Sequence, residues 1–569
     1  MHLVNLRSIK EKVGIKYVGY GIGALVGYKL INYMIWKTKN KKLNIRSAQI
    51  VAERDSKTYT FIEVSPEKTQ LILNLPDIQA IRENLFQRSF TISELVTVYS
   101  KRTVEIGRQL NLTAVELIDQ ALITANEYDQ ILDKHLKDGQ QSQLPPLFGI
   151  PISTKGDRNS RGAQIYQDHI ADDAVTVKLF KKAGAIIIVK ARSSGGDSAL
   201  VASRCVVLAV GTDIGGSIRV PAAFNGLFSF KPTGARTSNL GYLSGMPKIS
   251  TSSIVLASQG PMARSNDDLV LATKLQLDPQ IHTYDWKIPS SPFRENEYIS
   301  AVNGGKQKLR VGYIDRLPTL QSSKGARRAL QIAKDALEKQ GFELVPFNQT
   351  LEEVQTIKSA FQGIMISSNA GPVLKLLSDQ CEDLLKVNVA FYSYYSANPL
   401  KKFLLRTLLK LTGNHRFSNA IANCKDFSKD EIDDFIRKRE ESNENIRAKF
   451  QDLDIIGLIL PNYVHCAFKE SNQLSMNSLI DYTSIWNFFM YPCGTVPTTL
   501  VQASDTNPND YQDSFDDKVT KSIRNDIEDS EGMPMGVQVV GLSQMDERVL
   551  GLMKAIDNGV QFRSRPKDF

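Results

Sequence analysis

Short apolar runs alternate along much of the chain with segments whose apolar residues recur at helical spacing. The runs GIPIS, AIIIVK and DIIGLILP, at residues 149–153, 185–190 and 454–461, predict buried strands. The segments DDAVTVKLFKKAG (172–184) and SKGARRALQIAKDALEKQ (323–340), and residues 428–450, have the helical spacing. Strands that alternate with helices predict an α/β domain, and no internal repeat is evident.

The segment before this domain, residues 41–143, is predicted to be a linker and a helical arm. It contains a mixed strand at TYTFIEV (58–64), a helix over Asp77–Arg88 and a second helix over Thr91–Glu127. Thr91 and Glu94 form the capping-box pattern, which favours a helix start at Thr91. Near the other end of the chain, the acidic stretch Ser504–Glu531 is predicted to be a surface loop with one helix.

The N-terminal run Tyr17–Trp36 is about twenty residues long, which is enough for a helix to span a bilayer. Lys29 lies near its middle and weakens insertion. Three glycines spaced four apart allow close pairing with another helix; they are Gly19, Gly23 and Gly27. We expect residues 1–40 to be an uncleaved membrane anchor, with an interfacial helix as the alternative.

A second candidate membrane contact is PLKKFLLRTLLKLTG, residues 399–413. Phe403, Leu404 and Leu408 lie on one face of a helix there, with basic residues interspersed. Such a basic amphipathic helix indicates contact with a membrane surface. The alternative is a helix packed into the core with solvated lysines.

Composition narrows the class of protein. The chain has 569 residues, which suits one large domain with appendages, and a net charge of +9. Its basic residues do not alternate with aromatic ones, so we expect an anionic membrane rather than nucleic acid as the partner. Five cysteines without CxxC spacing argue against a disulfide framework or a zinc site and favour a reducing, cytosolic side.

The clearest functional signal is GTDIGGSIRVPAAFNGLFSFKPTGARTS, residues 211–238. Gly215 and Gly216 precede Ser217 and allow successive backbone N–H groups to converge on one point, as in an anion-binding nest. A nest beside a hydroxyl predicts an oxyanion hole, made here by the backbone of Ile214, Gly215, Gly216 and Ser217. Alone, the same loop is compatible with a phosphate-binding nest.

Two further residues complete a candidate catalytic set. Ser193 begins an SSGG turn twenty-four residues before Ser217, and Lys155 follows the strand GIPIS. None of the six histidines lies in these blocks, so a neutral lysine has to be the base for Ser217. Burial lowers the pKa of a lysine, and each pKa unit corresponds to about 1.4 kcal/mol.

These blocks closely resemble the amidase signature family, and within it the branch that hydrolyses fatty-acid amides. Further matching strings are GPMAR, LIDYTSIWNFFMYPCGTVPTT and MPMGVQVVG, at residues 260–264, 479–499 and 533–541. The resemblance implies a large twisted mixed β-sheet covered by helices on both faces, and a catalytic Ser-Ser-Lys triad. Ser217 would be the nucleophile, Ser193 the relay and Lys155 the base.

Four further residues are predicted to support the triad. Ser194, Thr212, Asp213 and Arg219 flank the two serine turns, and we expect Asp213 and Arg219 to form a structural ion pair. No metal or organic cofactor is implied. The expected partners are a lipid amide substrate and a membrane, and a homodimer is compatible with the resemblance.

One departure from the family pattern concerns the turn at Ser193. Only thirty-eight residues separate Lys155 from Ser193, about half of what the resemblance implies. Ala191 and Arg192 stand where the family usually has a glycine pair, so we expect a bulky cation to crowd the turn. Either an exon is missing from the sequence, or the chain is a natural shortened and inactive relative. Transcript sequencing across residues 189–193 distinguishes these alternatives.

The sequence therefore predicts a membrane-attached serine amidase that cleaves fatty-acid amides. We expect a signature domain over residues 144–569, with its catalytic core at 144–275 and a membrane-binding cap at about 380–425. The expected location is an intracellular membrane, single-pass or monotopic, with the catalytic domain on the cytosolic side. The alternatives are an amidase for other amides, including a glutamine-type amidotransferase subunit, and a catalytically inactive membrane scaffold.

Overall fold

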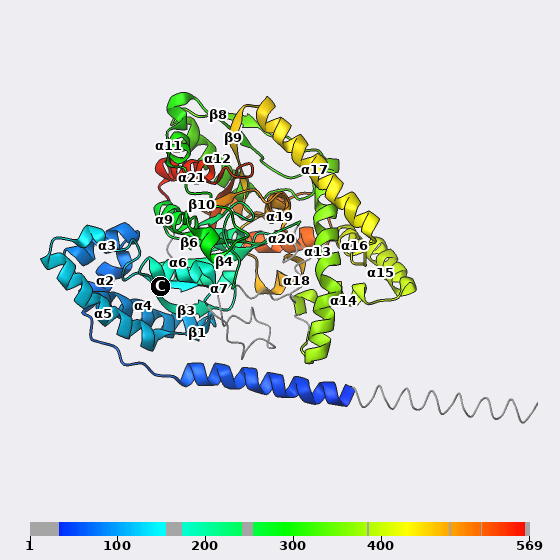
Figure 1. Cartoon of the computed structure of the whole chain (residues 1–569). Coiled ribbons are helices and arrows are strands. Elements are labelled where there is room, and N and C mark those ends of the chain that lie inside the picture. Colours follow the sequence, from blue (N-terminus) through cyan, green and yellow to red (C-terminus); the bar gives the residue numbers. More distant parts are fainter. Residues whose placement is uncertain are drawn as a thin grey trace, which may run out of the picture.

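The central feature of the molecule is a large mixed β-sheet (Figure 1). The computed structural model describes residues 33–154, 173–241, 254–383, 386–476, 479–513 and 515–563. Within these ranges the sheet has 11 strands in the order β1-β3-β2-β4-β6-β5-β10-β11-β9-β7-β8. The strands are β1 (Thr113–Glu116), β2 (Pro151–Thr154), β3 (Ile186–Ala191), β4 (Leu208–Asp213), β5 (Phe228–Lys231), β6 (Ser258–Ala263), β7 (Arg310–Tyr313), β8 (Glu343–Pro346), β9 (Ile455–Pro461), β10 (Cys493–Leu500) and β11 (Pro534–Val540).

Helices surround this sheet and fill most of the connections. In the first half of the chain they are α2 (Pro66–Asn74), α3 (Ile78–Phe86), α4 (Ile92–Arg102), α5 (Ile118–Lys137), α6 (Val175–Lys182), α7 (Ser194–Ala202), α8 (Arg219–Phe224), α9 (Asn266–Gln276), α10 (Ile281–Tyr284) and α11 (Glu295–Val302). In the second half they are α12 (Lys324–Glu338), α13 (Leu351–Gln380), α14 (Lys386–Tyr395), α15 (Pro399–Leu411), α16 (His415–Ala422), α17 (Lys429–Asp452), α18 (Gln473–Met476), α19 (Asp481–Phe488), α20 (Lys518–Glu528) and α21 (Asp546–Val560).

Both faces of the sheet are covered, as strand β9 shows. Ile459 belongs to a hydrophobic cluster that includes residues of α4, α5, α9, α12 and α21. Its neighbours Leu458 and Leu460 belong to a second cluster, with residues of α13, α17 and α19. Successive side chains of a strand point to opposite faces, so the two clusters lie on the two sides of the sheet. The predicted α/β fold with helices on both faces is confirmed.

Most elements lie close to their predicted positions, but two predictions in the arm are wrong. The single helix expected over Thr91–Glu127 is divided into α4 and α5 by strand β1, and Asn111 turns the chain between them with a positive φ of 54°. Asparagine tolerates this left-handed conformation, so the chain can reverse there and pair with β3. The strand expected at residues 58–64 pairs with no other described strand.

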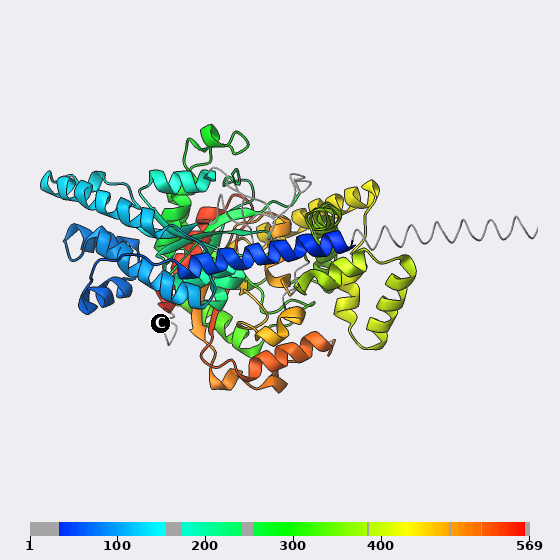
Figure 2. The same ribbon diagram turned by 90° about the horizontal axis from the view of Figure 1, so that it is seen from below.

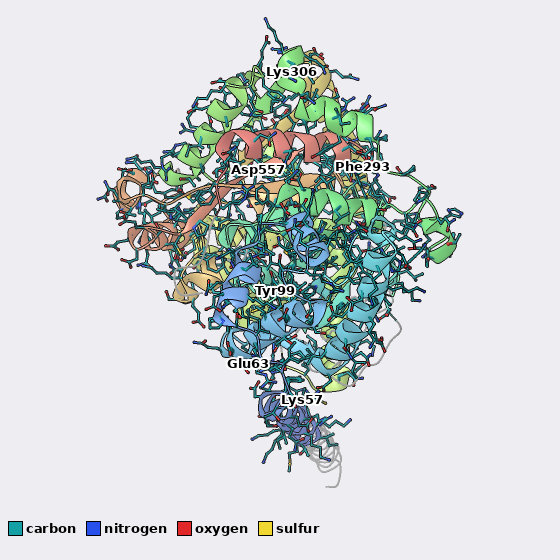
Figure 3. The ribbon with its side chains drawn as sticks, turned by 90° about the vertical axis from the view of Figure 1, so that its left-hand side faces the viewer. Lys57, Glu63, Tyr99, Phe293, Lys306 and Asp557 are labelled. Atoms are coloured by element: carbon teal, nitrogen blue, oxygen red, sulfur yellow. The ribbon has the colours of Figure 1, made fainter. Side chains whose placement is uncertain are left out.

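A helix at residues 33–56, here called the N-terminal helix, lies along one side of the molecule (Figure 2). Figure 3 shows Lys57 and Glu63 where the chain passes from this helix to the body. Among the described residues, no helix combines the length and the apolar character needed to cross a membrane. Most of the anchor predicted at Tyr17–Trp36 lies outside the described residues.

Helices α14, α15 and α16 form a projection beside the end of α13, within the predicted cap region (Figure 1). They share a small hydrophobic cluster centred on Tyr394, Ile421 and Cys424, against which Ile366 of α13 also packs. α15 contains no buried residue. The alternative of a core-packed helix at residues 399–413 is therefore wrong.

Candidate active site

Three neighbouring strands bring the predicted catalytic segments to one edge of the sheet. β2 lies between β3 and β4 and is parallel to both. The carboxyl ends of parallel strands meet at the same edge, so residues 154, 191 and 213 end the three strands on one side. In the sequence, Lys155 follows the first of these ends directly, Ser193 lies two residues after the second and Ser217 four residues after the third. Lys155 itself lies outside the described residues.

The loop between β4 and α8 has the backbone that the glycine pattern predicts. Gly216 has a φ of 125°, which favours glycine, and a Cβ at this position would collide with the Thr483 side chain. The Thr483 hydroxyl donates a 2.7 Å hydrogen bond to the carbonyl of Gly215. A Cβ at Gly215 would lie 3.1 Å from Ile480 and 4.0 Å from Phe361. Both glycines are therefore explained by close packing of α19 and α13 on the loop.

The backbone N–H groups of this loop divide into two sets. Those of Gly216 and Ile218 donate to the Asp213 carboxylate, at 2.7 Å and 3.2 Å. Those of Ile214, Gly215 and Ser217 have no acceptor among the described residues, and the Ser217 side chain is exposed. These unbonded donors beside an exposed hydroxyl suit an oxyanion, whereas the Gly216 N–H is occupied by Asp213. The assignment of the oxyanion hole stays a prediction.

Asp213 and Arg219 form the expected ion pair, and both side chains are fully buried. Arg219 Nε lies 2.9 Å from Asp213 Oδ2, and Nη2 lies 3.0 Å from Oδ1. Burial by itself raises the pKa of Asp213, but the charge and hydrogen bonds of Arg219 outweigh it and hold that pKa well below its usual range. A permanently ionised Asp213 can therefore hold the loop that carries Ser217.

Three residues that the sequence did not indicate complete this network. Asn487 donates to Asp213 at 2.9 Å, and Arg219 donates to the carbonyl of Thr483 at 3.2 Å and to the side-chain oxygens of Asn487 and Gln538. Thr483 and Asn487 lie in the LIDYTSIWNFF string and Gln538 in the MPMGVQVVG string. Both strings carried the family resemblance, but one sequence could not show that they contact Arg219.

In the second serine turn the two serines have different surroundings. Ser193 is exposed and caps α7, where its Oγ accepts the Gly196 N–H at 3.1 Å. Ser194 is buried, and its Oγ lies 3.2 Å from the Thr212 carbonyl and 3.3 Å from the Thr212 N–H. Ser194 therefore joins this turn to the end of β4. Within the described residues, no hydrogen bond links Ser193 to Ser217.

The two residues that replace the expected glycine pair do not obstruct this turn. Ala191 is buried as the last residue of β3. The Arg192 side chain extends toward β1, where Nε donates to the Thr113 carbonyl at 3.3 Å. The expectation that Arg192 crowds the turn is thus wrong in the described residues, where all peptide bonds are also trans.

The end of β2 contributes a further buried contact that the sequence did not indicate. Ser153 Oγ donates to Asp197 Oδ1 at 2.7 Å, and both side chains are buried. Asp197 lies in the first turn of α7, so it connects β2 to the turn of Ser193. Among the described residues, no group of three His, Cys, Asp or Glu side chains could hold a metal ion.

Comparison with known proteins gives one family and consistent relatives. The family model Amidase matches residues 94–192 and 193–550, and its two pieces meet at the position where the sequence analysis placed missing residues. Fatty-acid amide hydrolase 1 of Sus scrofa is 28% identical over 72% of this chain and 75% of its own length. An acetamidase of Emericella nidulans is 26% identical over 82% of this chain and 86% of its own.

Solved structures show the same fold. A fatty acid amide hydrolase superposes with a TM-score of 0.72 at 22% identity, covering 88% of this chain and 87% of the other. A peptide amidase from Stenotrophomonas maltophilia gives a TM-score of 0.58 at 18% identity, over 86% and 98%.

Proposed function

The chain belongs to the amidase family, and on this premise we propose that it is a membrane-attached serine amidase that hydrolyses amides of long-chain acyl groups. The observation that carries the proposal is that three adjacent parallel strands end one, two and four residues before Lys155, Ser193 and Ser217. This order matches the Ser-Ser-Lys triad that the family resemblance implies.

The proposed reaction begins with attack of Ser217 Oγ on the amide carbonyl. Its proton passes to Ser193 and from there to the neutral amine of Lys155. Although Ser193 Oγ accepts the Gly196 N–H, a hydroxyl that accepts one bond still has its own proton to donate. The relay then returns a proton to the departing amine. Water then attacks the acyl group on Ser217, and the relay of Ser193 and Lys155 takes its proton and returns a proton to Ser217 Oγ. This step releases the free acid.

Two features favour a lipid amide over other amides. Phe361 and Ile480 border the loop at Gly215, so apolar side chains line the loop that carries Ser217. On α15, Phe403, Leu404 and Leu408 are 66%, 56% and 57% exposed, and they are interspersed with basic residues. An exposed basic apolar helix suits docking to an anionic membrane surface. We place the protein on the cytosolic side of an intracellular membrane, attached in a monotopic manner through α15.

The proposed nucleophile is tested with a fluorophosphonate probe on the full-length chain, followed by mass spectrometry of the labelled peptide. We expect labelling at Ser217 that Ser217→Ala abolishes and that Lys155→Ala slows by at least 100-fold. Ser290→Ala is the matched control, because Ser290 is an exposed serine remote in sequence from the three catalytic segments. Absence of labelling in the wild-type chain would favour the inactive scaffold.

The substrate class is tested with a series of amides of one amine, from acetyl to oleoyl. We expect kcat/KM to rise with acyl length, because each buried CH₂ contributes about 0.8 kcal/mol, which corresponds to roughly fourfold. If the acetyl amide gives the highest kcat/KM, the lipid-amide proposal is contradicted. The protein would then be an amidase for short-chain amides.

A further inference from the structure

The N-terminal helix, which precedes the residues that the family model matches, contacts the turn of Ser193. Arg54 lies in the last turn of the N-terminal helix, and its side chain is only 7% exposed. Its Nη1 donates to the carbonyl of Thr113 in β1. Arg192, the residue before Ser193, donates to the same carbonyl through Nε at 3.3 Å. A carbonyl has two lone pairs and can accept both bonds.

The surroundings of this carbonyl fix it in place. Thr113 is paired with Ala191 across the β1–β3 ladder, and the Arg192 N–H donates to the Leu112 carbonyl at 3.1 Å. Asp55 Oδ1 lies 2.8 Å from Nε and 2.7 Å from Nη2 of Arg54. Its negative charge offsets the repulsion between the neighbouring guanidinium groups of Arg54 and Arg192. Arg192 therefore binds the short turn after β3 to the edge of the sheet through both its backbone N–H and its side chain.

The N-terminal helix is held at a second place, which makes it a fixed support. Asn40 Nδ2 donates to the Cys381 carbonyl at the end of α13, at 2.9 Å, and to Asp383 at 3.2 Å. Asn40 and Arg54 are fourteen residues apart, or about 21 Å along a helix. Figure 2 shows the helix crossing the molecule between these regions.

From this geometry we propose that Arg54 and Arg192 are positioning residues that fix the turn of Ser193 through the Thr113 carbonyl, here called the Arg54–Arg192 latch. Only Arg192 lies between the end of β3 at Ala191 and Ser193, so no longer loop supports the turn. The latch supplies that support from the N-terminal helix. Its effect on the reaction rests on the proposed function, because it acts through the relay serine.

The kinetic test compares Arg54→Ala, Arg192→Ala and the double variant. We expect each single change to lower kcat and the rate of fluorophosphonate labelling about tenfold, with KM unchanged. The double variant should be no slower than about tenfold, because both residues act through one carbonyl. Arg46→Ala is the matched control: Arg46 is an exposed arginine on the same helix that pairs with Glu53 at 3.4 Å. Effects that multiply in the double variant, or wild-type rates in either single variant, would overturn the latch.

A second measurement separates failure of the latch from failure of the proposed function. Hydrogen exchange of the peptide spanning residues 190–202 needs no catalytic activity. If wild type is not labelled at Ser217, the proposed function fails, and the latch still predicts faster exchange in Arg54→Ala than in Arg46→Ala. Unchanged exchange would overturn the latch. Thermal melting checks that Arg54→Ala is folded. If it is not, Arg54→Gln, which keeps much of the aliphatic side chain, replaces it in both experiments.

Discussion

At the scale of single residues, His465 couples stability to pH. Its Nδ1 lies 2.8 Å from Ser323 Oγ and its Nε2 lies 3.1 Å from Ser530 Oγ. Ser530 donates its proton to the Ile527 carbonyl, so Nε2 carries the hydrogen and Nδ1 accepts from Ser323. Burial lowers the pKa of His465 to about 4. The folded protein therefore holds the ring neutral.

This arrangement predicts a loss of stability in mild acid. In the unfolded chain, His465 binds a proton below the ordinary histidine pKa of about 6.5. In the folded chain, it binds that proton only below about pH 4. As the pH is lowered from about 6.5 to about 4, the contribution of His465 to the free energy of unfolding should fall by about 3 kcal/mol. Urea unfolding at several pH values measures the change, and His465→Gln should remove that part of the slope. The exposed His282 gives the control variant His282→Gln; a slope that His465→Gln leaves intact would contradict the prediction.

The residues that could be predicted are those whose chemistry is local in sequence. Ser217 and the Asp213–Arg219 pair lie within seven residues, so the spacing alone brings them together. Thr483 of α19 and Gln538 of β11 contact Arg219 from more than 260 residues away, through tertiary packing that no local pattern encodes. The orientation of Arg192 could not be predicted for the same reason, because its partner Thr113 lies on a strand in a segment whose sequence predicts a helix.

At the scale of elements, periodicity predicted the long helices and buried strands well. It failed where a short strand follows a turn residue, as at Asn111 and β1. The role of α15 depends on what covers it, which periodicity cannot show. In the structure Phe403, Leu404 and Leu408 are exposed, and we expect them to enter a membrane surface.

The triple variant Phe403→Ser/Leu404→Ser/Leu408→Ser tests this role of α15. Each of these side chains is roughly half exposed, so each should contribute about 1 kcal/mol on insertion, and together they should change vesicle affinity on the order of 100-fold. Flotation with phosphatidylserine vesicles measures the affinity. The matched control is Ile123→Ser, an exposed apolar residue on α5. Equal binding of the triple variant and the control would contradict docking through α15.

At the scale of the whole molecule, the sheet and the projection differ in how they are stabilised. The sheet lies between two large hydrophobic clusters, whereas α14, α15 and α16 share one small cluster. The projection is tied to the body by Arg416 of α16, which lies 2.8 Å from Asp513 and 2.7 Å from Asp517, where the carboxylates are nearly buried. The sheet therefore depends on extensive apolar burial, whereas the projection depends on a small apolar cluster and on this charged contact.

This difference predicts two levels of hydrogen exchange. Amides of α14 to α16 should exchange faster than those of β9 to β11, because local opening of the projection exposes little apolar surface. Arg416→Ala leaves two nearly buried carboxylates without their cation, so it should raise exchange in α14 to α16 and leave the strands unchanged. Arg437→Ala, at an exposed arginine of α17, is the control. Equal acceleration in the strands would show that the projection and the sheet open as one unit, and the proposed membrane contact on α15 would then be rigidly coupled to the site at Ser217.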